Sequence, residues 1–386
     1  MPYVVFGLIS YSAMLTTIVL GSKPKFIDLN IGLPKVYQIH MFTAIFIVIT
    51  MNLHKLGFSS FGMIGFFGEA ASFIFTVIIV FSMIYYTRMI TKYIPLLQKV
   101  KTLMENYIKH EWSLWVHRLC LVATLFVFMH VSLIDYIRNI PYFYPLFVIY
   151  SLIAFIFYAL YLKEFYLQKT NATLINLRPL DQEIHELVFQ LDQTIENYIP
   201  GQFVFISFPK QSKLKEAHPF SIVSIDKSHK QLTFGILDNG DFTNQLSLLS
   251  SGEPAILSKS YGILPELIQQ ANPQRPLVIL IGGIGITPFV SLLKNVPTET
   301  YIYYSVKLEK QFIYTDEINH WKLDSKVHVV EQKERITLEQ IKHDVTHFEQ
   351  AQFILAGPAA MNDAFTKQLE DVDISMDQIF CENFSW

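Results

Sequence analysis

Long apolar runs alternate with short polar segments through the first part of the chain. Five runs contain almost no Asp, Glu, Lys or Arg, and they cover residues 3–20, 36–54, 70–87, 112–134 and 139–162. Each is about 18 to 24 residues long, enough for an α-helix to span the ~30 Å hydrocarbon core of a bilayer. The first run lacks a preceding basic residue and a clear cleavage site, so it is interpreted as a retained helix. Residues 1–167 are therefore predicted to form a bundle of five transmembrane helices.

The pattern changes after this region. Short alternating runs at residues 203–208 and 231–237, separated by Pro-Gly, Asp-Asn-Gly and Ser-Gly turns, predict a small antiparallel β-barrel over residues 168–268. Beyond it, apolar strands at 277–281, 301–304, 327–330 and 353–355 alternate with polar helical stretches. This alternation predicts a parallel α/β domain over residues 269–386.

Composition and charge agree with a membrane protein joined to a soluble part. The chain is 51% hydrophobic and 16% charged, and the charges are concentrated after Lys163. The segments that follow the first, third and fifth helices hold ten Lys and Arg residues, whereas the opposite side holds only Lys55 and Arg138. The positive-inside rule then predicts an external N-terminus, with the C-terminal domains in the cytoplasm. The membrane is expected to be the plasma membrane.

Two of the apolar runs carry a pair of histidines each: His40 and His54 in one, His117 and His130 in the other. The spacings of 14 and 13 residues place the two imidazoles of each helix roughly 20 Å apart along its axis. Helices two and four are predicted to run in parallel, so His40 can pair with His117 and His54 with His130, around two stacked haems. Hydrogen-bonded interface histidines and proton relays are the alternatives.

The spacing of 13 residues raises a geometric question. Fourteen positions return to within ~40° of the starting face of a helix, but thirteen miss it by ~140°. The helix with His117 and His130 must therefore bend, tighten or carry a bulge, or its two haems must approach different faces.

The cysteines limit how a haem could be attached to the chain. Cys120 and Cys381 are the two cysteines, and no C-x-x-C-H motif is present, so any haem is held noncovalently. Arg118, beside His117, is a candidate partner for a haem propionate, with an interfacial anchor as the equal alternative.

The first strand of the α/β domain runs into Gly282-Gly-Ile-Gly-Ile-Thr-Pro288. Glycines let the backbone approach a phosphate, Thr287 suits a helix N-cap, and Pro288 suits the first helical turn. A helix N-terminus would then face an anion. This is not the full G-x-G-x-x-G fingerprint, and a plain strand-to-helix turn is the alternative.

Further short motifs occur in a fixed order after the paired histidines. They are His218-Pro-Phe-Ser221, Gly240-Asp-Phe-Thr243, the glycine-rich turn, Ala356-Gly-Pro-Ala-Ala-Met361 and Glu382-Asn-Phe384. Together they resemble the ferric reductase and NADPH oxidase superfamily over nearly the whole chain. The resemblance implies a membrane flavocytochrome b, an NAD(P)H-dependent oxidoreductase that passes electrons through FAD and two b-type haems to an extracellular acceptor.

The resemblance also implies site residues. The flavin would be held by residues of the barrel motifs, with Ser221 at the flavin ring: His218, Pro219, Phe220, Ser221 and Thr243. The nicotinamide nucleotide would be held by the turns after two strands: Gly282, Gly283, Gly285, Thr287, Gly357, Pro358 and Met361. Phe384 would cover the isoalloxazine where nicotinamide enters, although Trp386 competes for that place. Ser221 and Phe384 are the residues implied to act in hydride transfer.

Ser305 and Lys307 follow the strand at 301–304, where reductases of this family place groups that meet the adenosine ribose. A lysine there favours the 2′-phosphate of NADPH over NADH, which stays possible. A solvated loop lysine is the other interpretation of Lys307.

Three departures from the family pattern bear on function. Ala356 stands where the family usually has cysteine, and Ser385-Trp386 follows the usual terminal aromatic residue. Phe58 and a first helix without arginine stand where superoxide-producing oxidases carry histidine and arginine. Ferric iron in a chelate is therefore slightly favoured as acceptor, with O2 reduced to superoxide as the alternative. A haem subunit donating to a partner protein and a proton-relay transporter are weaker alternatives, and no nucleic acid or obligatory protein partner is expected.

Overall fold

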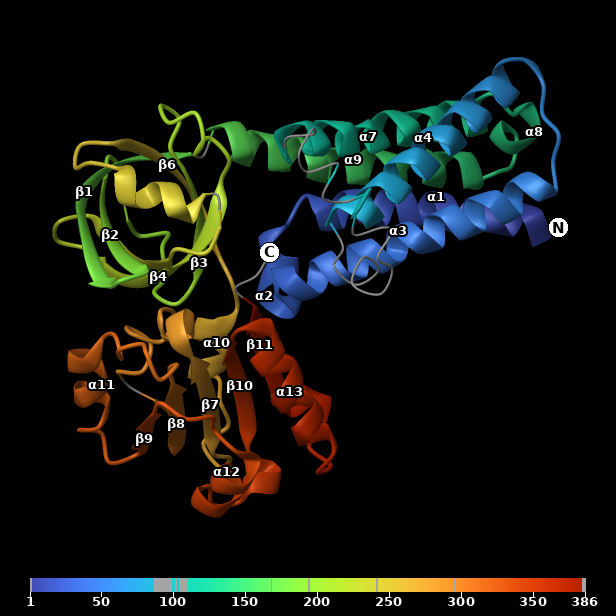
Figure 1. The fold of residues 1–386 in the computed structure, drawn as a ribbon. Coiled ribbons are helices and arrows are strands. Elements are labelled where there is room, and N and C mark those ends of the chain that lie inside the picture. Colours follow the sequence, from blue (N-terminus) through green and yellow to red (C-terminus); the bar gives the residue numbers. More distant parts are fainter. Residues whose placement is uncertain are drawn as a thin grey trace. The chain divides into compact units, whose positions relative to one another are not determined.

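The computed structural model describes residues 2–86, 99–100, 103, 110–167, 169–193, 195–240, 242–294 and 296–383. The chain divides into two compact units, Met1–Glu164 and Phe165–Trp386. The first unit is helical, and the second contains two β-sheets (Figure 1).

Long apolar helices build the first unit: α1 (Pro2–Gly21), α3 (Leu33–Leu56), α4 (Gly62–Tyr86), α7 (His110–Ser132) and α9 (Phe143–Leu167). Within the described residues, these five are long and apolar enough to cross a membrane, which confirms the predicted number. Two short helices, α2 (Lys25–Ile31) and α8 (Asp135–Arg138), lie in the connections.

The start of the third long helix was predicted wrongly. It was expected at residue 70 because Glu69 interrupts the uncharged run, but α4 begins at Gly62. The Glu69 carboxylate is paired with the Lys55 ammonium group at 2.5 Å, so the helix can include it. The predicted end of this helix, Thr87, lies outside the described residues. So do four of the basic residues from which the orientation was predicted: Arg88, Lys92, Lys101 and Lys109.

The helices of the first unit pack in two close pairs, α1 with α3 and α4 with α7. Their shared core includes Met14, Leu15, Ile47 and Ala123. Many large apolar side chains on the outer faces are exposed, among them Phe42, Phe46, Phe73, Leu152 and Ile156. A helix that is apolar on every side is expected in lipid, and these exposed side chains fit such a surface.

The second unit begins with a closed antiparallel barrel in the order β1-β2-β5-β4-β3-β6. Its strands are β1 (Thr170–Asp181), β2 (Ile184–Leu191), β3 (Phe203–Ser207), β4 (His218–Asp226), β5 (Gln231–Leu237) and β6 (Pro254–Tyr261). Alternating positions point inwards, so Leu187, Phe189 and Phe234 fill the barrel. The 3-10 helix η1 (Thr243–Leu248) lies between β5 and β6, and α10 (Leu264–Gln269) follows β6.

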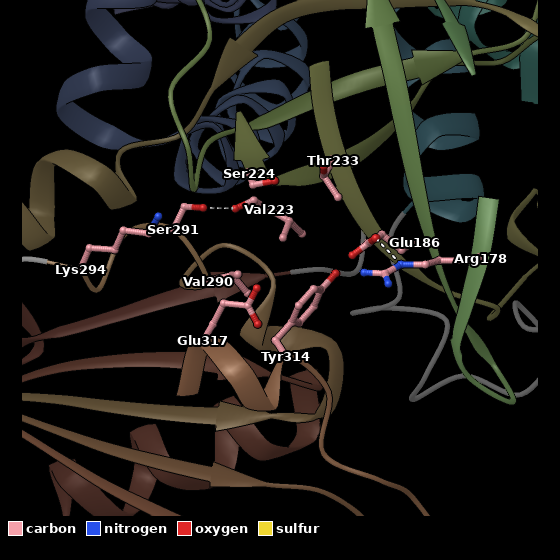
Figure 2. A pocket seen from close by; sticks show the side chains of 10 residues that line it. All are labelled: Arg178, Glu186, Val223, Ser224, Thr233, Val290, Ser291, Lys294, Tyr314 and Glu317. Atoms are coloured by element: carbon pink, nitrogen blue, oxygen red, sulfur yellow. Dashed lines mark hydrogen bonds and ion pairs between the residues drawn. The ribbon is translucent and has the colours of Figure 1, made fainter. Parts of the chain in front are cut away.

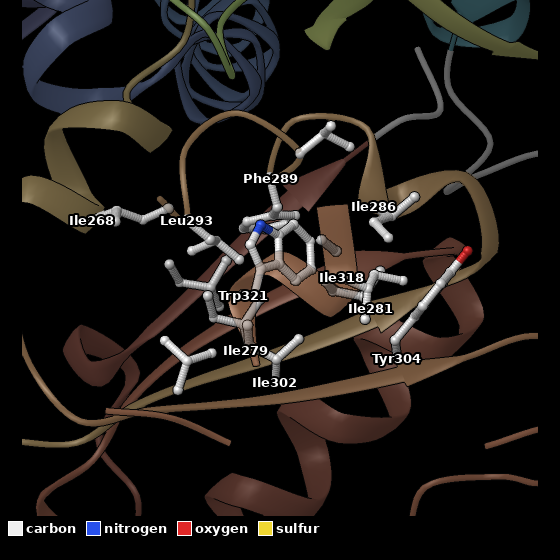
Figure 3. Packing of buried hydrophobic residues seen from close by; sticks show 14 of the residues in the cluster. Ile268, Ile279, Ile281, Ile286, Phe289, Leu293, Ile302, Tyr304, Ile318 and Trp321 are labelled. Atoms are coloured by element: carbon white, nitrogen blue, oxygen red, sulfur yellow. The ribbon is translucent and has the colours of Figure 1, made fainter. Parts of the chain in front are cut away.

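A parallel sheet follows in the order β11-β10-β7-β8-β9. Its strands are β7 (Leu277–Gly282), β8 (Thr300–Ser305), β9 (Val327–Gln332), β10 (Gln352–Gly357) and β11 (Ile379–Asn383). The helices are η2 (Gly283–Ile286), α11 (Thr315–Trp321), α12 (Leu338–Asp344), η3 (Phe348–Gln350), α13 (Ala359–Glu370) and η4 (Met376–Gln378). On one face Ile279 and Ile302 pack with Phe289 and Trp321, as Figure 3 shows.

The barrel and the parallel sheet are joined by direct contacts. The Ser291 hydroxyl donates a hydrogen bond to the Val223 carbonyl at 2.6 Å. Gly201, at φ 80°, leaves no room for a Cβ beside Leu292. Val223 of the barrel also belongs to the hydrophobic core of the sheet domain. The second unit is therefore one packed body in which the barrel and the parallel sheet hold each other in place.

Candidate functional site

The four membrane histidines lie in two pairs between α3 and α7. The ring centres of His40 and His117 are 6.1 Å apart, and those of His54 and His130 are 6.4 Å apart. An iron with one imidazole on each face holds the ring centres about 6 Å apart, because each metal–nitrogen bond is ~2 Å and each ring centre lies ~1 Å beyond its nitrogen. The structure thus brings together the pairs that the spacing predicted, at the separation that haem iron requires.

Hydrogen bonds determine which ring nitrogen of these histidines is free. Nδ1 of His54 donates to the Tyr3 carbonyl at 2.8 Å, and Nδ1 of His130 donates to the Ile64 carbonyl at 2.9 Å. A carbonyl can only accept, so in both rings the proton is on Nδ1 and Nε2 keeps its lone pair. Nε2 is then the nitrogen available to a metal. Nδ1 of His117 lies 3.2 Å from the Ser82 hydroxyl.

The sequence reasoning missed the small residues that lie behind these rings. A Cβ on Gly7 would come within 2.8 Å of Nδ1 of His54, and a Cβ on Gly68 within 3.0 Å of Nδ1 of His130. Gly21 lies behind His40 in the same way, with more room. The signal was present: Gly7 and Gly21 are 14 residues apart, as are Gly68 and Ser82, which nearly matches the histidine spacings on the facing helices.

The unequal histidine spacing is accommodated without a break in α7. Every residue from His110 to Ser132 is α-helical, with neither a bulge nor a 3-10 turn. Residues 13 apart on a regular helix point about 140° away from each other. Of the predicted alternatives, the one that fits is that the two rings leave α7 on different sides.

The predicted flavin residues gather at one end of the barrel. His218, Pro219 and Phe220 are half-buried on β4, and Ser221 is buried opposite Phe203 of β3. Phe242, which the prediction did not include, packs its ring 4.2 Å from that of His218 and 5.9 Å from that of Phe220. The barrel thus places an aromatic and imidazole surface beside the turn that leads to Thr243.

Thr243 holds that turn in shape. Its hydroxyl accepts a hydrogen bond from the backbone N–H of Asn239 at 2.8 Å. The turn between them contains Gly240 at φ 144°. Asp241 lies outside the described residues. A backbone turn with a hydroxyl at its base can bind a diphosphate, and this role of Thr243 stays a prediction.

The predicted nucleotide residues meet at the carboxyl edge of the parallel sheet. The chain order changes direction between β7 and β10, and ligands of open α/β sheets bind at such a switch point. Gly282 and Gly357 end these two strands, and a Cβ on either would lie 2.7 Å from the Met361 sulfur. Gly283 has φ 54° with open space where a Cβ would be. Gly282 and Gly357 are thus buried beneath Met361, whereas Gly283 leaves open space beside the backbone at this edge.

The helix expected after the glycine-rich turn is absent. Residues 283–286 form the 3-10 helix η2, and Thr287 follows its end instead of capping an α-helix. The Thr287 hydroxyl donates to the Ile284 carbonyl at 3.0 Å, and the bonds Thr287 N–H to Ile284 and Phe289 N–H to Ile286 keep the tighter three-residue pattern. A Cβ on Gly285 would overlap the Ala356 carbonyl. This close approach to β10 leaves no room for a side chain at Gly285, and the α-helix expected to begin at Thr287 is not formed.

The remaining predicted residues are Ser305, Lys307, Phe384 and Trp386. Ser305 ends β8 and is half-buried, and Lys307 is exposed on the loop that follows. Lys310 in the same loop pairs with Glu183 of the barrel at 2.8 Å, which ties the loop to the β1–β2 turn. Phe384 and Trp386 lie outside the described residues.

A polar cavity of about 250 Å³ lies between the barrel and the sheet domain (Figure 2). It shares no residue with the predicted cofactor sites. Buried Glu186 accepts from the Arg178 guanidinium at 2.7 Å, and this contact raises the pKa of Arg178. The Tyr314 hydroxyl is buried and makes no hydrogen bond to the described residues. Burial, and then the charges of Glu186 and Glu317, raise the pKa of Tyr314, so this phenol stays protonated.

Two family models match segments of the second unit. Residues 169–283 match the family model of an FAD-binding domain, and residues 279–367 match that of an oxidoreductase NAD-binding domain. These matches cover the closed barrel and most of the parallel sheet. The second unit therefore contains an FAD-binding domain followed by an NAD-binding domain of the oxidoreductase type.

Comparison with individual proteins adds two plant relatives. The chain is 30% identical over 189 residues to ferric reduction oxidase 3 of Arabidopsis thaliana, which is 48% of this chain and 24% of that protein. Ferric reduction oxidase 2 of the same plant is 29% identical over the same shares of the two chains. The match thus spans about a quarter of the length of these relatives. These findings confirm the resemblance to ferric reductases.

Further similarity is found with an electron transfer subunit and with a flavohemoglobin. The electron transfer subunit of dihydroorotate dehydrogenase B from Bacillus mycoides is 28% identical over 33% of this chain and 48% of that protein. The crystal structure of flavohemoglobin from Malassezia yamatoensis has a TM-score of 0.53 at 16% identity, over 99% of this chain and 96% of that chain. At this identity the likeness concerns the fold alone.

Proposed function

We propose that the protein is a membrane flavocytochrome b that carries electrons from cytoplasmic NAD(P)H, through FAD and two b-type haems, to an acceptor on the other side of the plasma membrane. Ferric iron in a chelate is the favoured acceptor. The observation that carries the proposal is the double histidine pair, with ring centres 6.1 and 6.4 Å apart, in a chain that also contains a flavin oxidoreductase.

The donor set fits haem. His40 and His117 would hold one iron, and His54 and His130 the other, each through Nε2. Nδ1–H of His54 and of His130 donates to a backbone carbonyl, which fixes the ring orientation and makes the free nitrogen a better donor.

The reductase part would bind flavin and nucleotide at neighbouring edges. His218, Phe220 and Ser221 would contact the flavin on β4, and Thr243 would shape the turn for its diphosphate. Gly282, Gly283 and Gly357 would let the backbone approach the nicotinamide nucleotide, with Pro358 and Met361 beside them. Bound FAD converts a two-electron hydride donor into a source of single electrons, which haem iron can accept.

Absorption spectra of the purified full chain test this proposal. We expect about two b-type haems and one flavin per chain, with both haem bands reduced by NAD(P)H without oxygen. His40→Ala or His117→Ala should remove one haem, and His54→Ala or His130→Ala the other. Unchanged haem content in all four variants, or no haem in the native chain, would contradict the haem assignment while leaving the flavin oxidoreductase in place.

A further inference from the structure

The four proposed haem ligands differ in the residue that lies behind the ring. In a helix, a glycine opens a path to the carbonyl four residues before it, because no Cβ covers that oxygen. His54 reaches the Tyr3 carbonyl past Gly7, and His130 reaches the Ile64 carbonyl past Gly68. The positions agree, since 7 − 4 = 3 and 68 − 4 = 64.

His40, the third ligand, also has a glycine behind its ring, but at a greater distance. His40 lies beside Gly21, where a Cβ would be 3.6 Å from Cε1 of the ring. Nδ1 of His40 is buried without a hydrogen bond of normal length in the described part of the chain. Glycine therefore backs three of the four rings.

Ser82 is the exception. It lies 14 residues after Gly68 on α4, at the place where the fourth glycine is expected, and its hydroxyl lies 3.2 Å from Nδ1 of His117. The Cβ of a serine would cover the carbonyl of Ile78, four residues earlier. A neutral imidazole that binds metal through Nε2 carries its proton on Nδ1, so in a haem-ligated His117 the Ser82 hydroxyl would be the acceptor, as a carbonyl is at His54 and His130. Other hydroxyls of α4 act within the helix, as Thr76 does by donating to the Ser72 carbonyl at 2.8 Å.

We propose that Ser82 is a positioning residue that orients His117 and sets the redox potential of the haem held by His40 and His117. The inference rests on the proposed haem ligation. An imidazole that donates from Nδ1 gives more electron density to the metal and so stabilises the ferric state. Because Ser82 is a side-chain acceptor, a substitution can remove it, whereas the backbone carbonyls behind His54 and His130 cannot be removed in this way.

Three substitutions separate the hydroxyl from the space it occupies. Ser82→Ala removes the acceptor and keeps the Cβ that covers the carbonyl. Ser82→Thr keeps the hydroxyl. Ser82→Gly uncovers the Ile78 carbonyl and makes the site like those of Gly7 and Gly68. Thr76→Ala is the matched control, because it removes a hydroxyl from the same helix without touching a histidine.

The test is a reductive titration of the full chain in detergent, followed by absorption and by low-spin electron paramagnetic resonance. We expect two haems in every variant, and in Ser82→Ala a positive shift in the midpoint potential of one haem only. Ser82→Thr and Ser82→Gly should lie close to the native value, and Thr76→Ala should not shift it.

Two results would overturn the inference. One is an unchanged potential and resonance spectrum in Ser82→Ala, and the other is an equal shift in Ser82→Ala and Ser82→Gly. Failure of the proposed function has a different signature, since the native chain would then contain no haem to titrate.

Discussion

At the scale of single residues, small side chains determine what the histidines can do. Gly7 and Gly68 let two imidazoles contact helix backbone directly, and this contact leaves Nε2 of each ring free. Phe242 shapes the predicted flavin site, since its ring packs on those of both His218 and Phe220. A glycine in an apolar run does not stand out in a sequence, and the motif Gly240-Asp-Phe-Thr243 did not by itself single out Phe242. Only the neighbours of these residues in space show their roles.

Gly7→Ala tests this role of glycine. The added Cβ would lie 2.8 Å from Nδ1 of His54, so the ring must move and its haem should be lost. In an ordinary helix interior, Gly→Ala stabilises the protein by roughly 0.5–1 kcal/mol. A harmful effect of Gly7→Ala would therefore be specific to its contact with His54. Gly21→Ala is the control, because its Cβ would lie 3.6 Å from the His40 ring, an ordinary contact. Haem per chain should fall from about two towards one in the first variant only; equal haem in both would rule the idea out.

Lys307→Ala tests nucleotide choice. The side chain is exposed at the carboxyl edge of the sheet, where a 2′-phosphate would add about two negative charges. Loss of one charge-assisted contact costs ~1.5 to 3 kcal/mol, or on the order of 10- to 100-fold in affinity. The Michaelis constant for NADPH should rise by that factor while that for NADH stays nearly constant. Lys326→Ala, at the opposite edge before β9, is the control, and equal effects on both nucleotides would refute the assignment.

At the scale of elements, close approach between neighbouring strands decides the shape of the nucleotide edge. The turn after β7 is a 3-10 helix because Gly285 lies directly against the Ala356 carbonyl of β10. An α-helix beginning at Thr287 satisfied the local rules for N-caps, but local rules contain no information about the neighbouring strand.

Gly285→Ala should therefore damage one domain selectively. Its Cβ would overlap a backbone carbonyl, which no rotamer change relieves, and such overpacking costs typically 1–3 kcal/mol or more. The barrel has a separate core, so flavin and haem should stay bound. We expect reduction of the flavin by NAD(P)H to be strongly slowed while dithionite still reduces the haems. Normal NAD(P)H-driven reduction would show that the turn tolerates a side chain.

A second test at this scale concerns the contact between the barrel and the parallel sheet. Ser291→Ala would remove the 2.6 Å hydrogen bond to the Val223 carbonyl and leave a buried acceptor unpaired, at a cost of ~1–3 kcal/mol. The temperature at which the full chain releases flavin should fall. Glu183→Gln, which breaks the exposed pair with Lys310, should leave it nearly unchanged, because exposed ion pairs contribute little. The interpretation fails if the second variant is the more harmful.

At the scale of the whole molecule, the open question is the acceptor. Phe58 lies 5.2 Å from the His54 ring and is exposed, so an apolar side chain stands where oxidases of the resembling family carry histidine. With a soluble chelate as acceptor, ferric reduction should continue without oxygen and resist superoxide dismutase. The preference for iron is wrong if anaerobic ferric turnover is negligible while superoxide-dependent cytochrome reduction is fast.

The sequence by itself determined the classes of structure and the chemistry. Helices in lipid follow from composition and length alone, so all five were predicted correctly, with an error only where Glu69 hid a helix start. The barrel and the parallel sheet followed from turn residues and strand rhythm, which are also local signals. The order of short motifs indicated FAD and NAD(P)H before any fold was known.

Only the tertiary structure decided which groups meet. The separations of 6.1 and 6.4 Å between histidines, the glycines behind them and Ser82 at the fourth place depend on how helices far apart in sequence pack. Gly285 against β10 decided the turn after β7 for the same reason. Periodicity describes one element at a time, whereas steric exclusion and hydrogen bonding between elements require both partners in place.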